Sequence, residues 1–416
     1  MTAPRTEAPG PPVATRTWSF AALLGALVML GPFSIDLYLP AFATIGAAFD
    51  VPQVAVQATL STYLFAYAFM MLWHGALSDA LGRRAVVLGS LVVYAVATLG
   101  CAIAGNIESL WLARALQGLS AGAGLVIGRA IIRDRFHGPD AQRLMAQVTL
   151  VFSIAPAVAP VVGGLLLNAL GWRSMFWALL AFTLGLFAWT ARALPETHPP
   201  AARTPLHPRT LARNYRNVAG HAGFLMLGLV PALNFCAFFI YIAGAPSFLV
   251  DLLGVSTMGF GWLFIPLIAG VMIGASASGR LAGRISPAKT VRTGFLFMGA
   301  AAAANVLVSA FAPAQVALNI APLFFFMIGS AMSTPTIMVM LLDLFPAMRG
   351  LASSLQGFVQ FALGGLVAGT VAPILDRSLL ALALGMAAFC ATSWTLWVVQ
   401  QRRTHVVPSS SPTDDR

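Results

Sequence analysis

Long apolar runs dominate this sequence, and twelve of them are long enough to cross a bilayer as helices. Such a span needs about 20 consecutive apolar residues. Short loops with Gly, Pro, Asn or charged residues separate the runs. The chain is 59% hydrophobic and only 9% charged, whereas a soluble domain carries roughly 25% charged residues. The sequence therefore predicts an all-α membrane protein with twelve transmembrane helices.

The runs form two groups of six, separated by a segment that is rich in proline and arginine. This segment has no apolar helical period, and we expect it to be a cytoplasmic linker. The predicted parts are a cytoplasmic N-terminal tail (1–18), a first six-helix bundle (19–192), the linker (193–218), a second six-helix bundle (219–400) and a cytoplasmic C-terminal tail (401–416).

The basic residues predict the orientation of the chain. Of the 24 Lys and Arg residues, 21 fall in segments that share the side of the termini, while the outer loops hold only Arg173 and Arg377. Because cytoplasmic loops are enriched in Lys and Arg, this bias predicts two cytoplasmic termini. We therefore expect a multi-pass protein of the bacterial inner (plasma) membrane. The net charge of +11 follows from the same loops, so the lipid bilayer is an expected partner and nucleic acid is not.

One acid lies inside a span where topology does not explain it. The first run, from Ser19 to Phe42, contains no charge other than Asp36, within GPFSIDLYLP. A charged carboxylate at a helix centre costs about 2.5–3.5 kcal/mol on the insertion scale. We interpret Asp36 as a proton or cation site; the alternative is an Asp that only bonds a neighbouring helix. Pro32 and Pro40 each remove a helical hydrogen bond, which predicts an irregular helix around Asp36.

Arg114 is a second embedded charge, and Gln117 lies on its face at helical spacing. One interpretation is an arginine that extends to the outer interface of the membrane. The other is a cation that faces the bundle, holds a hydrogen-bond network and adjusts the protonation of Asp36.

Aromatic and polar stripes on the second, seventh and eleventh spans predict a large, mostly apolar substrate cavity. Few hydrogen-bonding side chains accompany them, which suits a lipophilic cargo better than a sugar. Each stripe alone is also compatible with ordinary helix packing. The candidate cavity residues are Tyr38, Tyr63, Tyr67, Gln117, Asn234, Phe235, Phe238, Tyr241, Gln356 and Gln360.

Prolines and glycines mark candidate hinges. The fifth span contains SIAPAVAPVVGG at 153–164, in which Ala155, Ala159 and Gly163 form a small-residue stripe. Such a stripe allows close helix contact, so packing alone also accounts for it. The candidate hinge residues are Pro32, Pro40, Pro156, Pro160, Gly163 and Gly164.

The loop between the second and third runs reads GALSDALGRR at 75–84. Its pattern resembles the signature loop of the major facilitator superfamily. Four further stretches resemble the bicyclomycin/chloramphenicol-resistance (Bcr/CflA) branch of its drug:proton antiporters: SIDLYLPAF at 34–42, LSTY at 60–63, RALQG at 114–118 and SIAPAVAPVVGG at 153–164. The resemblance covers essentially all twelve spans.

The resemblance implies two pseudo-symmetric bundles around a central cavity that opens alternately to either side. It implies that Asp36 is the branch's membrane acid and Arg114 its fourth-helix arginine. A cytoplasmic gate is implied at Gly75, Asp79, Gly82, Arg83 and Arg84. The resemblance assigns no role to His74 or Arg129. The corresponding loop of the second half, at 279–287, lacks an acid equivalent to Asp79.

These observations predict a monomeric exporter of small lipophilic compounds that exchanges them for protons, without a cofactor or a metal. An exporter or facilitator of a small metabolite, such as an amino acid, a polyamine or a siderophore, remains an alternative on the same fold. A membrane enzyme is disfavoured because the six histidines form no ligand cluster: His74, His137, His198, His207, His221 and His405. A sensor or scaffold is disfavoured because the tails are short.

Overall fold

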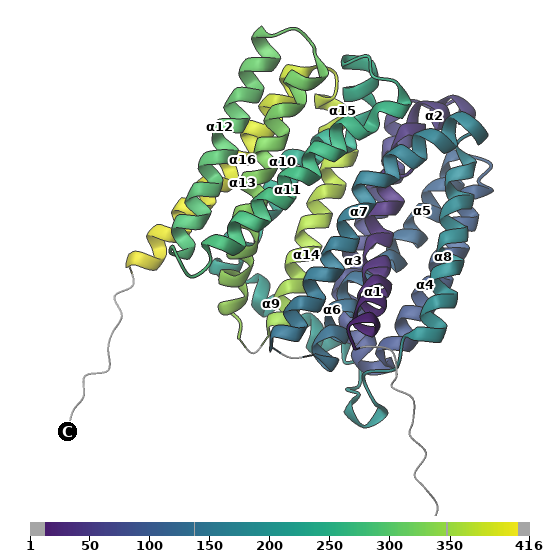
Figure 1. Ribbon diagram of the computed structural model, residues 1–416, viewed down its shortest axis with the longest axis vertical. Coiled ribbons are helices and arrows are strands. Elements are labelled where there is room, and N and C mark those ends of the chain that lie inside the picture. Colours follow the sequence, from purple (N-terminus) through teal and green to yellow (C-terminus); the bar gives the residue numbers. More distant parts are fainter. Residues whose placement is uncertain (1–12, 137, 347, 407–416) are drawn as a thin grey trace, which may run out of the picture.

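The computed structural model describes residues 13–136, 138–346 and 348–406, and these residues form helices and short connections without a strand. Twelve helical segments are long and apolar enough to cross a membrane. They form two bundles of six that lie side by side (Figure 1). The prediction of an all-α protein with twelve membrane helices is therefore confirmed. The predicted tails and His137 lie wholly or largely outside the described residues.

The first bundle contains six spans, two of which are interrupted. Its elements are α1 (Val13–Asp36), η1 (Leu39–Ala41) and α2 (Phe42–Phe49) in one span, then α3 (Gln53–Leu81), α4 (Arg83–Ala102), α5 (Ile107–Ala121) with α6 (Ala123–Arg135), α7 (Gly138–Leu170) and α8 (Arg173–Ala193).

The second bundle repeats this order with different interruptions. Its elements are α10 (Ala222–Ala243) and η3 (Ser247–Leu252), η4 (Thr257–Phe260) with α11 (Gly261–Leu281), α12 (Pro287–Phe311), α13 (Val316–Asp343), α14 (Arg349–Leu366) with η5 (Val367–Val371) and α15 (Ala372–Leu375), and α16 (Leu379–Val406).

The first span breaks where the sequence predicts it to break. Helix α1 ends at Asp36, the 3₁₀ turn η1 follows, and α2 continues the span. Pro40 lies in that 3₁₀ turn, where it provides no backbone N–H to the Asp36 carbonyl. The prediction of an irregular helix is confirmed, but its end at Phe42 is wrong, because the helical segment extends to Phe49.

The segment between the bundles is more ordered than its sequence predicts. It includes the 3₁₀ turn η2 (Pro200–Ala202) and a helix, α9 (Pro208–Ala219). The Tyr215 hydroxyl on α9 donates to the Leu72 carbonyl on α3 at 2.9 Å. Helix α9 also contacts α14 of the second bundle. The expectation of no helical period is wrong here. Leu211, Tyr215 and Val218 recur at helical spacing and form the half-buried or buried face of α9, while its arginines are exposed.

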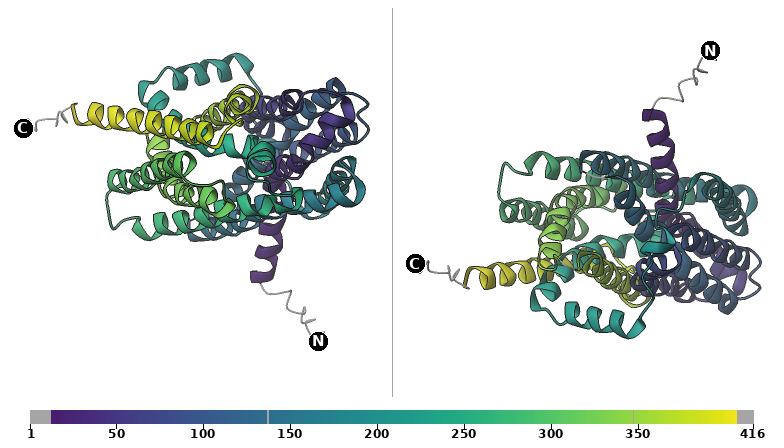
Figure 2. Two further views of the ribbon diagram at one scale, coloured as in Figure 1. Left: turned by 90° about the horizontal axis from the view of Figure 1, so that it is seen from above. Right: turned by 90° about the horizontal axis from the view of Figure 1, so that it is seen from below.

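The two bundles meet along two pairs of helices. Helix α3 packs against α14 and η5, and α7 packs against α11 and η4. Views along the bundle show the two halves side by side around this interface (Figure 2). These contacts place the residues of α3 and α14 that face each other at the centre of the molecule.

Candidate substrate and proton path

Asp36 is buried at the end of α1, with 5% of its surface exposed. Among the described residues, no side chain forms a hydrogen bond or an ion pair with its carboxyl group. Buried charged groups in proteins are normally paired. A buried carboxyl group without a partner is more stable in its neutral form than in its charged form.

Arg114 is fully buried on α5, with none of its surface exposed. Its guanidinium carbon lies 4.3 Å from the ring centroids of both Tyr38 and Tyr63. The guanidinium donates to the Ser34 carbonyl at 3.2 Å and to the Gln117 side chain. Cation–π contacts and these hydrogen bonds, both from Nη1, compensate for part of the lost hydration. Nε and Nη2 have no hydrogen-bond partner among the described residues. The alternative in which Arg114 extends to the membrane surface is excluded by this burial.

Arg114 and Asp36 form no ion pair within the part of the chain that the structure describes. Arg114 instead binds the backbone of Ser34, two positions before Asp36. Two positions along a helix turn a side chain by roughly 200°, so the carboxylate lies on another side of α1. Arg114 therefore anchors the helix beside the break and does not bond the acid.

Gln117 completes the network around Arg114. Its amide nitrogen donates to the Thr98 hydroxyl on α4 at 2.8 Å, while its oxygen accepts from Arg114. The Tyr38 hydroxyl lies 3.0 Å from the Thr59 hydroxyl on α3. Tyr38, Tyr63 and Gln117 are thus all buried in the first bundle, close to Arg114.

A chain of aromatic rings crosses from the first bundle to the second. Tyr63 and Tyr67 on α3 lie 6.0 Å apart between ring centroids, and Tyr67 lies 4.6 Å from Phe361 on α14. Phe361 lies 5.8 Å from Phe235 on α10, which contacts Phe238 at 5.2 Å. Sequence reasoning missed Phe361, although it directly follows Gln360.

The remaining cavity candidates of the second bundle occupy different surroundings. The Gln356 amide donates to the Gln360 side chain at 3.1 Å on α14. The Tyr241 hydroxyl accepts from Asn305 at 2.6 Å and lies inside the bundle. Asn234 is buried, and its amide finds no hydrogen-bond partner among the described residues. The structure brings the Gln356–Gln360 pair close to Phe361 but leaves Tyr241 apart from it.

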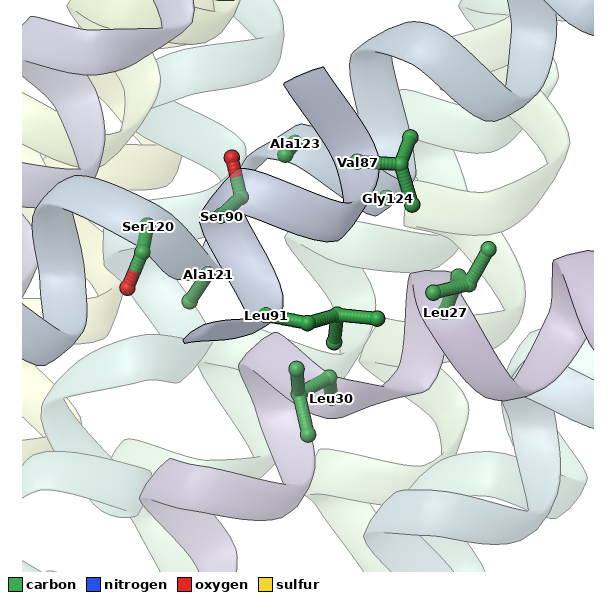
Figure 3. Close-up of a pocket in the computed structure, with 9 residues that line it drawn as sticks. All are labelled: Leu27, Leu30, Val87, Ser90, Leu91, Ser120, Ala121, Ala123 and Gly124. Carbon is green, nitrogen blue, oxygen red and sulfur yellow. The ribbon is translucent and has the colours of Figure 1, made fainter. Parts of the chain in front are cut away.

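Two cavities lie away from these residues. A small one of about 10 Å³ lies among α1, α4, α5 and α6, with Ser90 and Ser120 as its polar residues (Figure 3). Such a volume accommodates one water molecule at most. A groove of about 580 Å³ lies between α12 and α16 and is lined by apolar residues such as Phe295 and Trp394. Neither cavity includes a predicted substrate residue, so the predicted cavity stays a prediction.

The signature loop is a tight turn between α3 and α4. Gly82 has φ +101°, and a Cβ at this position would lie 2.5 Å from Glu196 Oε2. Arg83 is buried and donates to Asp79, to Ser78 and, at 3.2 Å, to Asp134 Oδ2. The loop thus needs glycine for two reasons, its backbone angle and the close approach of Glu196.

The other basic residue of the loop and the linker complete this cluster. Arg84 donates to the Ala191 carbonyl at 2.6 Å. Glu196 accepts from the backbone N–H groups of Arg83 at 3.0 Å and of Arg84 at 3.3 Å, where a carboxylate stabilises the start of α4. Gly75 packs near Val126 of α6. Sequence reasoning missed Asp134 and Glu196. The position of Asp134 between Arg133 and Arg135 was a signal, whereas Glu196 had none.

The end of the bundles opposite this loop has a polar contact between them. Asp376, which lies between α15 and α16, accepts from Gln57 Nε2 at 2.9 Å and from the Ser247 hydroxyl at 3.3 Å. Gln53 donates to that hydroxyl at 3.0 Å. Burial raises the pKa of Asp376, while the bonds from Gln57 and Ser247 oppose this rise. Sequence reasoning missed this cluster because its members lie far apart in the chain.

Pro40 lies in the break of the first span, whereas the other candidate hinge residues lie within helices. Pro32 lies within α1, and Pro156 and Pro160 lie within α7. A Cβ on Gly163 would lie 2.0 Å from the Leu37 carbonyl, and a Cβ on Gly164 would lie 2.6 Å from the Thr257 carbonyl. These two glycines therefore let α7 contact both the break in the first span and the second bundle.

Two candidates that the resemblance leaves without a role differ in their surroundings. His74 is buried against α6, and neither ring nitrogen has a hydrogen-bond partner in the described structure. Arg129 on α6 is exposed. Within the described ranges, no group of three His, Cys, Asp or Glu residues could hold a metal ion.

Comparisons with known proteins agree with this architecture. A sequence model of the Major Facilitator Superfamily matches residues 23–369. A bicyclomycin resistance protein homolog of Haemophilus influenzae is 28% identical over 360 residues, which cover 86% of this chain and 89% of the relative. A chloramphenicol resistance protein of Pseudomonas aeruginosa is 29% identical over 380 residues, 86% of this chain and 85% of the relative.

A solved structure shares the fold at much lower sequence identity. The crystal structure of a bacterial homolog of the human lysosomal transporter Spinster, in an inward-facing and unoccupied conformation, superposes with a TM-score of 0.71. The match covers 95% of this chain and 98% of that chain, at 16% identity.

Fold and comparisons together define a multi-pass membrane transporter. The chain belongs to the Major Facilitator Superfamily, and its relatives fit the bicyclomycin/chloramphenicol-resistance branch. Transporters of this superfamily bind small-molecule substrates, so the chain is a transporter and not an enzyme.

Proposed function

We propose that this protein exports small lipophilic compounds, including antibiotics, in exchange for protons. It acts as a monomer in a bacterial inner membrane, with both termini in the cytoplasm. The names of the two relatives, which refer to bicyclomycin and chloramphenicol resistance, support the class of cargo. The bias of basic residues toward the side of the termini supports the orientation.

The observation that carries the proposal is the unpaired carboxyl group of Asp36, buried beside the break in the first span. A proton neutralises it, and a cargo that donates a hydrogen bond or a positive charge to it competes with that proton. Because the two ligands exclude each other at one group, each weakens the affinity for the other. This competition is sufficient to couple export of the cargo to proton entry.

Arg114 has a positioning role in this proposal. Its bond to Ser34 joins α1 to α5 beside the break, and its aromatic contacts join Tyr38, in the break, to Tyr63 on α3. These contacts fix the position of α1 just before Asp36. The proton therefore enters a site whose backbone is already held in place.

The asymmetry of the contacts between the bundles supports alternating access. At the end with Asp376, Gln57 links the two bundles directly. At the signature-loop end, the hydrogen bonds of Asp79, Arg83 and Arg84 in the described part of the chain stay within the first bundle and the adjoining linker. This pattern corresponds to a state closed toward the periplasm and open toward the cytoplasm. In the opposite state, we expect the loop to contact the second bundle.

Inverted membrane vesicles with an acidic interior provide the test. Lipophilic drugs and small metabolites are added singly, and proton release is recorded for the wild type and for Asp36→Asn. We expect drug-dependent release in the wild type only, with the variant folded at normal abundance. Equal release from the variant would exclude Asp36 as the coupling site. Release with metabolites alone would instead support the metabolite exporter.

A further inference from the structure

Arg129 lies inside a membrane span without any compensating charge. It stands on α6, which ends at Arg135, and its side chain is exposed. Within the described residues it forms no hydrogen bond and no ion pair, and Arg133 follows one helical turn later. Basic residues this deep in a span normally face a partner or a water-filled space.

The packing of α6 shows which way Arg129 points. Gly122 lies against His74 and Tyr67 of α3, whereas Gly124 and Gly128 lie against Leu27 and Val28 of α1. Ala123 and Gly124 share a small cavity with Val87 and Leu91 of α4 (Figure 3). At about 100° per residue, Arg129 falls between the α1 face and the α3 face, on the side away from α4. It therefore faces the space between the bundles.

Tyr67 provides a second polar group on this face. Its hydroxyl interacts electrostatically with Arg129, and it has no hydrogen-bond partner in the described part of the chain. The Tyr67 ring packs against Phe361 of the second bundle. Arg129 and Tyr67 thus present two hydrogen-bond donors beside the aromatic chain that crosses between the bundles.

The acid and the arginine lie at different levels of the first bundle. Arg129 is next to Gly128, which packs against Val28, and Val28 precedes Asp36 by eight positions on α1. Eight helical residues rise by about 12 Å. Tyr67, which contacts Gly31, lies between these two levels. Along α1, the order is therefore the acid, then the aromatic rings, and then the cation nearer the signature loop.

We propose that Arg129 and the Tyr67 hydroxyl bind an electron-rich oxygen of the cargo, so that the preferred cargo is a dipolar amphiphile. Its carboxylate lies at Arg129, its apolar body lies against the aromatic chain, and its amine lies at Asp36. This inference rests on the proposed function, since the amine has to compete with the proton at Asp36. A cargo with only a carboxylate lacks the group that displaces the proton.

Three compounds with one aromatic body test this assignment: an amine, a carboxylic acid, and an amino acid that carries both groups at opposite ends. Binding to the purified full-length protein and proton release from vesicles are measured for each compound. The variants are Arg129→Gln, Arg129→Lys and Asp36→Asn. Arg192→Gln is the matched control, because Arg192 is another arginine at the same end but lies on α8 and bonds its own helix.

We expect the wild type to bind the amino acid roughly tenfold or more tightly than the amine, the effect of one charge-assisted hydrogen bond. Arg129→Gln removes this preference and leaves binding of the amine unchanged. Arg129→Lys retains part of it, and Arg192→Gln retains all of it. Asp36→Asn abolishes proton release, while the carboxylate of the amino acid still contributes to binding through Arg129.

Other results overturn the inference, and they differ from a failure of the proposed function. Equal binding of all three compounds to wild type and Arg129→Gln, with proton release still dependent on Asp36, refutes the role of Arg129 alone. If Arg129→Gln weakens the binding of all three compounds equally, Arg129 has a structural role. No binding of the amino acid by the wild type refutes the dipolar cargo. Arg129-dependent binding without any proton release refutes the antiport and retains the cargo site.

Discussion

The hydrogen bond from Gln57 to Asp376 is expected to hold the two bundles together at the end opposite the signature loop. It joins α3 to the junction of α15 and α16 at 2.9 Å, with both residues buried. Gln57→Leu introduces an apolar side chain of similar size, which has no hydrogen-bond donor. Asp376 then keeps only the Ser247 bond at 3.3 Å, and the closed conformation loses stability relative to the open one.

The size of the effect follows from the chemistry of the bond. A hydrogen bond to a carboxylate contributes about 1.5–3 kcal/mol. With about 1.4 kcal/mol for each factor of ten, the ratio of closed to open molecules falls by roughly 10- to 150-fold. A neutral carboxyl group would give less, so the measurement is made at mildly alkaline pH.

Cysteine accessibility measures this ratio. Ser61 on α3 is buried against η5, since a Cβ on Gly369 would lie 2.7 Å from the Ser61 hydroxyl. A Ser61→Cys variant is labelled from outside the cell with a membrane-impermeant maleimide, and the native cysteines, Cys101, Cys236 and Cys390, are buried. We expect Gln57→Leu to accelerate labelling by at least tenfold.

A double-mutant cycle provides the control. Gln57→Leu should accelerate labelling far less in an Asp376→Asn background than in the wild type, because the charged bond is already absent there. Unchanged labelling in Gln57→Leu, in protein of normal melting temperature, would refute the reasoning. Independent, additive effects would show that the two residues act separately.

Three further outcomes are expected from the described contacts. Because burial raises the pKa of Asp376, protonation of its carboxyl group stabilises the closed end. The labelling rate of Ser61→Cys should therefore rise as the pH increases from about 3.9 through the raised pKa. Asp376→Asn should abolish this pH dependence. Gly82→Ala should lower the melting temperature, since φ is +101° and a side chain held in so sparsely populated a backbone region costs about 1–3 kcal/mol. A matched Gly89→Ala, which meets no atom within 4 Å, should not. Arg114→Leu should destabilise the protein by about 1–3 kcal/mol in thermal unfolding, because Ser34 and Gln117 lose a donor; unchanged unfolding would contradict its positioning role.

The amino-acid sequence alone determined the class of this protein. Apolar runs of sufficient length require helices in a bilayer, because backbone groups there have no water to bond. The same local reasoning placed the irregular helix at Asp36, since Pro40 lacks an N–H whatever surrounds it. It also located the connection between the second and third spans, which the structure confines to Gly82 between α3 and α4.

Only the tertiary structure decided which side chains meet. Arg114 and Asp36 are both embedded charges in the sequence, yet Arg114 lies between Tyr38 and Tyr63 and binds Ser34. The packing of α1 against α5 determines this choice, and no local pattern encodes it. Asp376 resembles an ordinary loop acid in the sequence, but folding buries it against Gln57 from the other half of the chain. Contacts between residues so distant depend on how helices pack, whereas helix positions depend on local hydrophobicity.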